Sequence, residues 1–598
     1  MFTKKRSLFF LTFVVIVGLV LSACGAATAT PTQAPVSTEA PGSTQQPAQA
    51  TEAAPTTTSE PLNKDITIVI PEDPPSFNAV IAYTGYDAMV MKLVLLGLTR
   101  IDPDGNIYPE LAAELPTLDN GDVVQDESAG TMSVTWKMRQ DVQWEDGKPV
   151  TADDVIFTYN AITDPNTGSW IPGIDTVDSV EKIDDYTFKV NYNAITPSYL
   201  TLFGGEQVAI WPAHYCDASQ GFSAWDCGLK PLSNGPFVMT DWVKGDHLTF
   251  NRNDKYYQTG KPDIDQVTVK IIPDATVRKQ MMINGDADIN MWTNETVTAD
   301  LQKEANVKVS ISPNDRFVMR LFMNEAAKGE TDAVAHPHPI LSDVSVRQAI
   351  RMAIDVDTIS QQIFSGFSKP VWTEFFRPPY NQCNIARPKF DAAAANTLLE
   401  GAGWMDTDGD GVRECHGCKT GAADGYKMEM ELITYKEYGD PILLTQQLIA
   451  EELAKIGIKL NLTAVEGSVL WADSQSGGIE MTGNFDIDLW DDGYAGTDPG
   501  DFIYQYYASD SIQPDNGWNI ARWDNAEFND FLSSSYTLDD AQRQDDFCKM
   551  AQIMDQEVPM ILLFTTIDAD AYSPRLEGVQ STVNDVVTWN AADWKVVK

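Results

Sequence analysis

The sequence lacks the short signatures that mark several common kinds of active site. It has no G-x-S-x-G of serine hydrolases, no H-E-x-x-H of zinc proteases and no G-x-x-x-x-G-K-[ST] phosphate-binding loop. With 86 Asp and Glu residues, a catalytic carboxylate pair of the glycosidase kind would not stand out by counting, and no pattern points to one. A secreted hydrolase therefore stays open as an alternative without a motif to support it.

Positive charge is also scarce. The chain has 42 Lys and Arg against 86 Asp and Glu, a formal net charge of −44, which becomes −47 once Lys4, Lys5 and Arg6 are removed with the N-terminal segment described next. Nucleic acid phosphates are bound by Lys and Arg, so this balance argues against a nucleic-acid partner. It is not by itself evidence for a cationic ligand, because acidic surfaces on secreted proteins mostly serve solubility.

Long hydrophobic runs are limited to the N-terminus. Basic residues at 4–6 precede an apolar run over 7–21, and small residues lead from it to Cys24. This order predicts a signal peptide over 1–23, and its ending resembles a bacterial lipobox, in which Cys24 is lipidated and becomes N-terminal. A retained signal anchor is the alternative, but a run of about 15 residues is short of the ~20 that span a bilayer. No second run of that length follows.

The rest of the chain divides by composition. Residues 24–61 are almost wholly Thr, Ala, Pro, Gln, Ser and Glu, and such a segment cannot bury enough apolar surface to offset its ordering entropy. We predict a disordered Thr/Pro/Ala-rich tether that lets the folded body move above the lipid. Residues 62–598 exceed the ~250–300 residues at which one hydrophobic core stops growing, so two or three lobes are expected.

Six cysteines remain after Cys24, and an even number outside the cytoplasm suggests disulfides. We predict that Cys216 pairs with Cys227, which would close a short local loop. Cys415-His-Gly-Cys418 could be a redox or zinc half-site, although no second pair of metal ligands stands at a suitable spacing. The pairing of the other four cysteines stays open: Cys383, Cys415, Cys418 and Cys548.

Local patterns predict an α/β fold. Val134, Trp136 and Met138 alternate with polar residues as in a half-buried strand, and Thr151 and Asp154 are spaced as in a capping box at a helix start. Because such patterns interleave along the chain, we expect mixed sheets covered by helices. Further strands are predicted at 66–70, 267–271 and 458–463, and helices at 88–98, 391–400 and 442–456.

The amino-acid sequences of several segments indicate a protein family, which their predicted secondary structure alone does not. Residues 136–159 read WKMRQDVQWEDGKPVTADDVIFTY and resemble a segment of the family 5 extracellular solute-binding proteins, R-x-V-x-W/F-x-D-G-x-P-T-A-D-D-V after a strand. These proteins are the oligopeptide, dipeptide and nickel receptors of ABC importers. Blocks at 66–78, 97–112, 233–262 and 343–350 also resemble the family, so the likeness extends over nearly all of residues 62–598.

The resemblance implies a two-lobed, periplasmic-binding-protein-like fold of type II with a cleft between the lobes and an extra subdomain in lobe I. On the family pattern the chain should cross to lobe II around 270–275, where Pro273 could help define a hinge. The expected segments are lobe I at 62–107, the extra subdomain at 108–206, lobe I at 207–272, lobe II at 273–565 and a lobe I return at 566–598.

The resemblance also points to residues 489–499, LWDDGYAGTDP, as a ligand-contacting segment. Peptide-binding relatives carry G-W-x-A-D-Y-x-D-P here, and their first Asp pairs with the peptide α-ammonium. When the segments are aligned on Asp498-Pro499, that Asp falls on Ala495, so the carboxylate is absent from its usual place. Asp491 or Asp492 could reach the same cation from a shifted loop; otherwise the site would accept a blocked or longer peptide, or a sugar.

Trp490 and Tyr494 suit stacking on a sugar or an apolar side chain, and core packing is the alternative for both. In the family, the loop over 72–78 lies across the cleft from this segment, and Tyr83 and Tyr86 follow it. The candidate ligand contacts are Glu72, Asp73, Phe77, Tyr86, Trp490, Asp491, Asp492, Gly493, Tyr494 and Asp498.

Two segments resemble metal sites. Asp406, Asp408 and Asp410 are spaced as in a calcium loop and Glu414 could add an oxygen, but Gly417 replaces the Glu that usually ends such a loop. We favour an Asp/Gly-rich turn, so calcium is an open alternative and no other cofactor is expected. The two imidazoles of the segment 336–339, HPHP, suggest nickel, yet only five histidines exist and nothing nearby completes a ligand set.

Together, the motifs and the family resemblance imply a binding protein and not an enzyme. We expect a lipid-anchored monomer outside the cytoplasmic membrane that captures a solute and delivers it to ABC permease subunits, which work with cytoplasmic ATPases. The resemblance favours an oligopeptide as the solute, with an oligosaccharide as the alternative within the family.

Overall fold

The computed structural model describes residues 62–597 apart from 81–84, 127, 165–170, 172, 221–224, 313–314, 437, 495, 513 and 515–516. The predicted signal peptide, Cys24 and the tether over 24–61 therefore lie outside the described residues, as do Tyr83 and Ala495. None of the helices within the described ranges has both the length and the apolar composition that a membrane span requires.

The first main sheet has seven strands with both parallel and antiparallel pairs. β1 pairs in parallel with β10 and β11, and its last three residues are all buried, as expected for a strand covered on both faces. In spatial order the strands are β12 (Lys308–Ile311), β20 (Ala569–Tyr572), β11 (Ile289–Asn290), β1 (Asp65–Ile70), β10 (Gln266–Ile271), β9 (His247–Arg252) and β8 (Phe237–Val243).

Helix α1 (Tyr86–Val94) belongs to the core of this sheet, because every residue after Tyr86 is buried. The sequence predicted a longer helix, over 88–98. The helix ends at Val94 because Leu95 is extended and Gly97 lies so close to Gly204 that a Cβ would approach the Gly204 Cα to 2.6 Å. This contact requires glycine on both segments and brings residues 204–208 against the end of α1.

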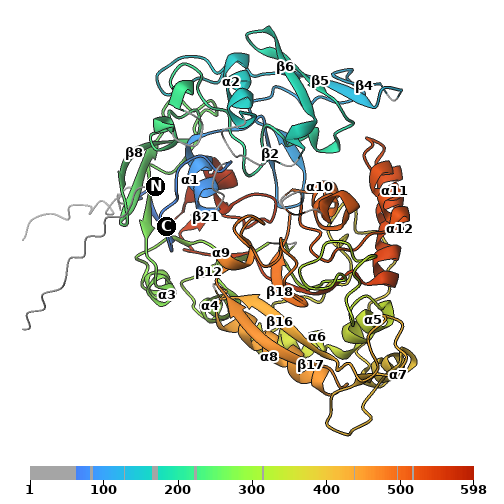
Figure 1. Ribbon diagram of the computed structural model, residues 1–598. Coiled ribbons are helices and arrows are strands. Elements are labelled where there is room, and N and C mark those ends of the chain that lie inside the picture. The colour runs from blue at the N-terminus through green and yellow to red at the C-terminus, as the bar shows by residue number, and fades with distance from the viewer. Residues whose placement is uncertain are drawn as a thin grey trace, which may run out of the picture. The chain divides into compact units, whose positions relative to one another are not determined.

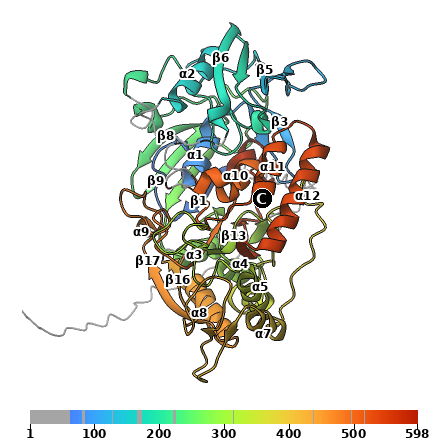
Figure 2. The ribbon, with the colours of Figure 1, turned by 45° about the vertical axis from the view of Figure 1, so that its right-hand side comes forward.

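A separate antiparallel sheet of four strands follows, with α2 (Ala152–Ile162) beside β6 in both ribbon views (Figure 1, Figure 2). The predicted alternation is confirmed, since Val134 and Trp136 are fully buried while Lys137 is exposed. The capping box is also confirmed, and the Thr151 N–H donates to Asp154 Oδ2 at 2.9 Å. The strands in spatial order are β4 (Val123–Asp126), β5 (Thr131–Lys137), β7 (Thr187–Tyr192) and β6 (Val177–Asp184).

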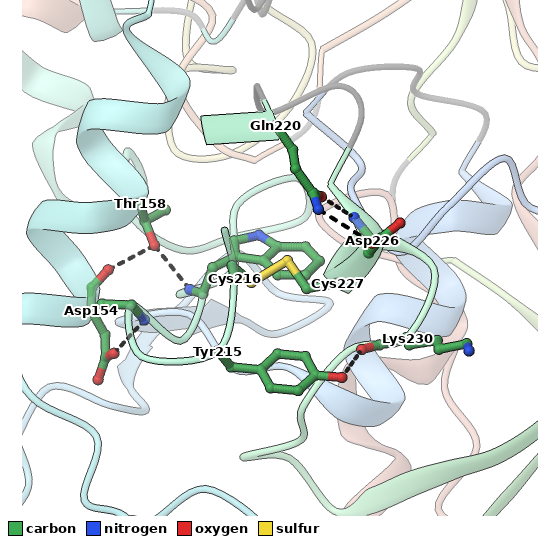
Figure 3. Close-up of a disulfide and its surroundings, with 10 residues drawn as sticks. Asp154, Thr158, Tyr215, Cys216, Gln220, Asp226, Cys227 and Lys230 are labelled. Atoms are coloured by element: carbon green, nitrogen blue, oxygen red, sulfur yellow. Dashed lines mark hydrogen bonds between the residues drawn. A yellow bond between two sulfur atoms is a disulfide. The ribbon is translucent and has the colours of Figure 1, made fainter. Parts of the chain in front are cut away.

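The loop after this sheet is closed by a disulfide between Cys216 and Cys227, the pair that the sequence predicted (Figure 3). The Tyr215 hydroxyl donates to the Lys230 carbonyl at 3.0 Å within the same loop. The loop is also tied to α2, because the Ala213 N–H donates to Asp154 Oδ1 at 2.8 Å. One carboxylate therefore caps the helix and anchors the loop.

The second main sheet has five strands and is again mixed, with β16 parallel to β17 and β18 and β13 antiparallel to β18 and β19. β16 and β17 lie beside α8 in both ribbon views (Figure 1, Figure 2). In spatial order the strands are β17 (Lys459–Val465), β16 (Glu429–Tyr435), β18 (Ile487–Asp492), β13 (Val318–Met323) and β19 (Met560–Thr565).

The chain crosses between the main sheets later than the predicted position at 270–275. β11 and β12 come after that position and still pair within the seven-stranded sheet. We define the first crossing by its described residues, 312 and 315–317, and the return crossing as residues 566–568. The prediction was wrong because β11 and β12 are two and four residues long, too short to show a period in the sequence.

The helices around the five-stranded sheet begin close to where the sequence predicted. Asp391 caps α7 by accepting from the Ala394 N–H at 2.8 Å, and α8 starts earlier than predicted because Pro441 fits its first turn. The remaining helices are α3 (Ala275–Asn284), α4 (Glu295–Leu301), α5 (Val344–Ala353), α6 (Val356–Ile363), α7 (Ala392–Gly401), α8 (Asp440–Ala454), α9 (Gly467–Leu470), α10 (Gly500–Tyr507), α11 (Ala526–Ser534) and α12 (Asp540–Glu557). Three short strand pairs are β2 (Thr99–Ile101) with β3 (Ile107–Pro109), β14 (Trp404–Met405) with β15 (Glu414–Cys415), and β21 (Leu576–Glu577) with β22 (Lys595–Val596).

The four cysteines whose pairing the sequence left open form two disulfides, Cys383–Cys548 and Cys415–Cys418. The second pairing shows that Cys415 and Cys418 are not a zinc half-site in this structure. The first joins residues 165 positions apart in sequence and the second residues 3 apart. The two bonds should therefore differ widely in what they contribute to stability.

Replacing both Cys383 and Cys548 by Ala should lower the free energy of unfolding by about 5 kcal/mol, because the loop that this bond closes is long. Replacing Cys415 and Cys418 by Ala should cost only about 1.5 kcal/mol. Denaturant unfolding of the two double variants measures the difference. Equal losses would contradict loop closure as the source of the stabilisation.

Candidate functional site

A cavity of about 1090 Å³ lies between segments that precede the first crossing and segments that lie between the two crossings. It is lined on one side by residues 197–202 and 204–208 and on the other by the end of β18, α10 and the start of α12. Arg316 and Phe317 of the first crossing line it as well. Its volume is slightly above the ~300–1,000 Å³ typical of small-molecule sites.

A second cavity, of about 540 Å³, is lined only by residues between 351 and 563. These residues all belong to the part of the chain that lies between the two crossings. A ligand there would not contact the seven-stranded sheet or its attached segments. The larger cavity is therefore the candidate site for a protein that works by bringing its two halves together.

The end of β18 carries the predicted contact residues into the cavity. Ile487 and Leu489 are fully buried and fix the strand between β16 and β13, so its polar end is held at the cavity wall. Of the predicted contacts, those that line the cavity are Trp490, Asp491, Asp492, Gly493, Tyr494 and Asp498.

Aromatic rings form much of this wall. Trp490 lines the cavity and also packs in the core, because its indole stacks on Phe322 with 4.8 Å between ring centroids. Tyr494 is covered by the Arg377 guanidinium, 3.9 Å from the ring centroid. We define the aromatic wall as Trp471, Trp490, Tyr494, Phe502, Tyr506 and Trp518.

The two adjacent carboxylates at the end of β18 are held by hydroxyl groups. The Tyr435 hydroxyl donates to Asp491 Oδ1 at 2.9 Å, and the Tyr506 hydroxyl donates to Asp492 Oδ2. Burial raises the pKa of Asp491 to about 6 and also raises the pKa of Asp492. Among the described residues, neither carboxylate has an ion-pair partner.

The segment 204–208 on the opposite wall is positioned by buried charges. The Lys92 ammonium of α1 donates to the Gly205 carbonyl and lies 3.1 Å from Asp585 Oδ2 of the C-terminal segment. The next residue, Glu206, accepts from Arg316 Nη1 with both oxygens, at 2.9 and 3.1 Å. Since Arg316 lies on the first crossing, this ion pair joins the wall to the crossing.

Gly493 packs against the same crossing. A Cβ at Gly493 would lie 2.1 Å from the Arg316 carbonyl oxygen, so only glycine allows β18 and the crossing to approach this closely. In the return crossing, burial raises the pKa of Asp568 to about 7, an effect that the charge of Arg316 opposes. Both crossings and one end of β18 thus meet around Arg316.

The structure does not place Glu72, Asp73, Phe77 and Tyr86 in the lining of this cavity, and a ligand contact at these residues stays a prediction. Asp73 accepts from the Trp242 indole N–H and the Gly245 N–H, and Phe77 is fully buried against Trp242. Glu72 is exposed, and Tyr86 packs on Trp292. The loop packs on β8 and β9, so its polar and aromatic groups are used within the fold.

Neither predicted metal segment supplies a clear ligand set. His338 Nδ1 accepts from the Ile340 and Leu341 N–H groups and its Nε2 lies 3.1 Å from Asp486, so both ring nitrogens are engaged, which argues against nickel.

In the acidic loop, the oxygens of Asp406, Asp408, Asp410 and Glu414 lie within 4.8 Å of one another. The Lys427 ammonium lies among them, 3.3 Å from Asp408 and in contact with Asp410. The side chains of Asp406, Asp408 and Asp410 accept from backbone N–H groups of the same loop, as in the Asp/Gly-rich turn that we favour, and calcium stays the untested alternative.

Several cavity residues carried no signal in the sequence. Glu206 and Arg316 are 110 positions apart and pair only in the folded chain. Arg543, which binds Asp498, lies in the first turn of α12, where no motif marks it as a site residue. The family resemblance was the only sequence signal for the site, and it located only the wall at the end of β18.

The two mixed sheets, the two crossings between them and the cavity lined from both sides define a two-lobed solute-binding protein. The sequence model of the bacterial extracellular solute-binding proteins, family 5 Middle, matches residues 106–514. The chain therefore belongs to family 5 of the bacterial extracellular solute-binding proteins. This is a family of binding proteins and not of enzymes.

Relatives and solved structures agree with this membership. The oligopeptide-binding protein AppA of Bacillus subtilis is 25% identical over 594 residues, 96% of either chain. Its crystal structure with a nonapeptide has a TM-score of 0.67 at 22% identity, covering 89% of this chain and 99% of that one. NikZ of Campylobacter jejuni, solved with Ni(L-His), has a TM-score of 0.69 at 20% identity, covering 89% and 99%.

Replacing Gly493 by Ala should lower the free energy of unfolding by about 1–3 kcal/mol, because the new Cβ would collide with the backbone of the first crossing. Gly401 is the matched control. It lies at the end of α7 with no atom within 4 Å of its virtual Cβ, and Gly401→Ala should be neutral or slightly stabilising. Denaturant unfolding compares the two, and equal stability of both variants would contradict the close approach.

Proposed function

We propose that this protein is the lipid-anchored receptor of an ABC importer, and that it captures an oligopeptide outside the cytoplasmic membrane and presents it to the permease. The observation that carries the proposal is the cavity of about 1090 Å³, which is lined by segments that precede the first crossing, by the crossing itself and by β18 and α10 between the two crossings. A ligand in this position contacts both halves of the fold at once.

An oligopeptide is the solute that the relatives favour. AppA is named for oligopeptides, and relatives in Pseudomonas aeruginosa that are 24% identical over 430 residues are named for dipeptides and tripeptides. The aromatic wall suits apolar side chains, and the carboxylates at the end of β18 suit an ammonium group. An oligosaccharide would use the aromatic wall alone.

The mechanism that fits this geometry is closure of the two halves around the solute. The first crossing and the return crossing are the two described places where the chain passes between the main sheets, so rotation would take place there. A solute that contacts both walls stabilises the closed form by its greater affinity for that form. Closure excludes water and strengthens the polar contacts inside.

The predicted N-terminal features complete this proposal. Lipid on Cys24 would hold a monomer at the membrane, and the tether over 24–61 would let the body reach permease subunits whose cytoplasmic ATPases supply the energy.

A thermal-shift screen tests the binding function. An oligopeptide should raise the melting temperature, since a ligand at 100 times its Kd adds about 2.7 kcal/mol to stability. Oligosaccharides and metal chelates serve as the competing compounds. Gln505→Trp, which fills the cavity from α10, should abolish the shift, whereas Gln447→Trp on the exposed side of α8 should preserve it.

Two outcomes would contradict the proposal. One is a shift by sugars or chelates and by no peptide, which would reject the peptide as solute. The other is an equal shift in both tryptophan variants, which would place the binding outside the cavity.

Replacing Cys24 by Ser should release the protein from the membrane, because serine has no sulfur to form the thioether bond through which the lipid is attached. The variant should lose metabolic labelling with a fatty acid and move to the soluble fraction. Thr28→Ser is the control within the tether and should remain at the membrane. Retention of the label in the Cys24→Ser variant would contradict the anchor.

A further inference from the structure

The charged groups of the cavity are strongly unbalanced. Its lining includes two arginines, Arg316 and Arg543, and no lysine or histidine. It includes seven carboxylates: Asp119, Glu206, Asp491, Asp492, Asp498, Asp501 and Asp540. An imbalance inside a cavity has more effect on a ligand than the same imbalance on an open surface, because water screens it less.

Both arginines are already neutralised by carboxylates of the protein. Arg316 is bound by Glu206 through both carboxylate oxygens. Arg543 binds Asp498 in a bidentate pair, with both contacts at 2.8 Å, and its Nε donates to the Ser535 carbonyl at 2.9 Å. A ligand carboxylate would therefore meet no free cation among the described residues of the lining.

The other five carboxylates have no ion-pair partner among the described residues. Asp119 and Asp540 are exposed, so water solvates them. Asp491, Asp492 and Asp501 are half-buried and receive hydroxyl and backbone hydrogen bonds only. Such carboxylates have lost part of their hydration without gaining a direct ion pair. The arginines nearest to them, Arg320 and Arg543, are each paired with another carboxylate, so a cationic group of a ligand would supply the missing contact.

These three carboxylates form two separate positions. Asp491 and Asp492 lie at the end of β18 and use the hydroxyls of Tyr435 and Tyr506. Asp501 lies in the first turn of α10, and it accepts from the Tyr536 hydroxyl at 3.2 Å. The two positions share no hydrogen-bond partner among the described residues, so each can receive its own cation.

The aromatic wall supports the same class of ligand. Phe502 follows Asp501 in sequence and its ring centroid lies 4.4 Å from that of Tyr506, which holds Asp492. Rings therefore lie beside both anionic positions. An alkylammonium or guanidinium group beside a carboxylate would also be attracted to such ring faces.

We propose that the cavity selects solutes with at least two positive charges, one bound at Asp491 and Asp492 and the other at Asp501. This inference rests on the proposed function and names its substrate class. Two kinds of molecule have this chemistry, a peptide with basic side chains and a linear polyamine. The absence of a free cation in the described lining disfavours acidic peptides and sugar acids.

Isothermal titration calorimetry with three tripeptides of equal length tests the selection. Lys-Ala-Lys should bind at least about tenfold more tightly than Ala-Ala-Ala, and Glu-Ala-Glu should bind least. Spermidine has several positive charges and no peptide group, so it distinguishes a basic peptide from a polyamine as the solute. If Lys-Ala-Lys binds and spermidine does not, the solute is a peptide. If both bind, the cavity selects by charge alone.

Variants locate the two positions. The double variant Asp491→Asn, Asp492→Asn and the single variant Asp501→Asn should each weaken Lys-Ala-Lys binding about tenfold. Ala-Ala-Ala has one ammonium group and can occupy one position at a time, so at most one of the two variants should weaken its binding. Asp530→Asn removes an exposed carboxylate on α11 outside the cavity and is the charge-matched control, expected to change neither affinity.

The affinity for Lys-Ala-Lys should also rise between about pH 5 and about pH 7.5. Burial raises the pKa of both Asp491 and Asp501 to about 6, so both are largely protonated at the lower pH and cannot bind a cation. Asp491 faces Asp492, Tyr435 and Arg320. Asp501 faces Asp498, Tyr536, Arg543 and Asp175.

Equal affinities for the three tripeptides would overturn the charge selection and leave the proposed function intact. Lys-Ala-Lys binding that is unchanged in both cavity variants would overturn the assigned positions. If no tripeptide and no spermidine binds while another solute raises the melting temperature, the charge selection is overturned and the binding function stands. If no solute of any class binds, the charge selection and the proposed function are both overturned.

Discussion

The ion pair between Arg316 and Glu206 connects the parts of the molecule that make the site. Arg316 lies on the first crossing and is buried, and a buried charge without its partner would cost several kcal/mol. Glu206 accepts two hydrogen bonds from the Arg316 guanidinium and thereby fixes the segment 204–208. Lys92 of α1 donates to the Gly205 carbonyl in the same segment. Gly493 touches the backbone of the same Arg316. One residue therefore positions both walls of the cavity relative to the crossing.

This arrangement also decides what the cavity can recognise. Glu206 and Asp498 are used to hold arginines, so these arginines are not available to a ligand carboxylate. The carboxylates at the end of β18 and in the first turn of α10 keep only hydroxyl and backbone partners. The same ion pairs that stabilise the fold thus leave the cavity with unpaired negative charge and aromatic rings.

Much of the fold could be predicted where a local pattern exists. The strand around Trp136, the capping box at Thr151 and the helix after Asp391 follow from spacing alone, and the family resemblance located the wall around Trp490. The crossing could not be placed, because β11 and β12 are too short to show a period. The wall at 204–208 depends on pairs between distant residues, such as Glu206 with Arg316. The loop over 72–78, which the resemblance placed across the cleft, does not line this cavity, and Asp73 accepts from Trp242 and Gly245 within the fold.

The central claim is that a solute binds between the two walls and contacts both. Hydrogen–deuterium exchange with and without a saturating basic tripeptide tests this most directly, because it reports backbone protection along the whole chain. The account predicts slower exchange in residues 198–208 and also in 490–506, with no change in residues 351–373 of the second cavity. Protection confined to 351–373, or to one wall of the larger cavity, would contradict it.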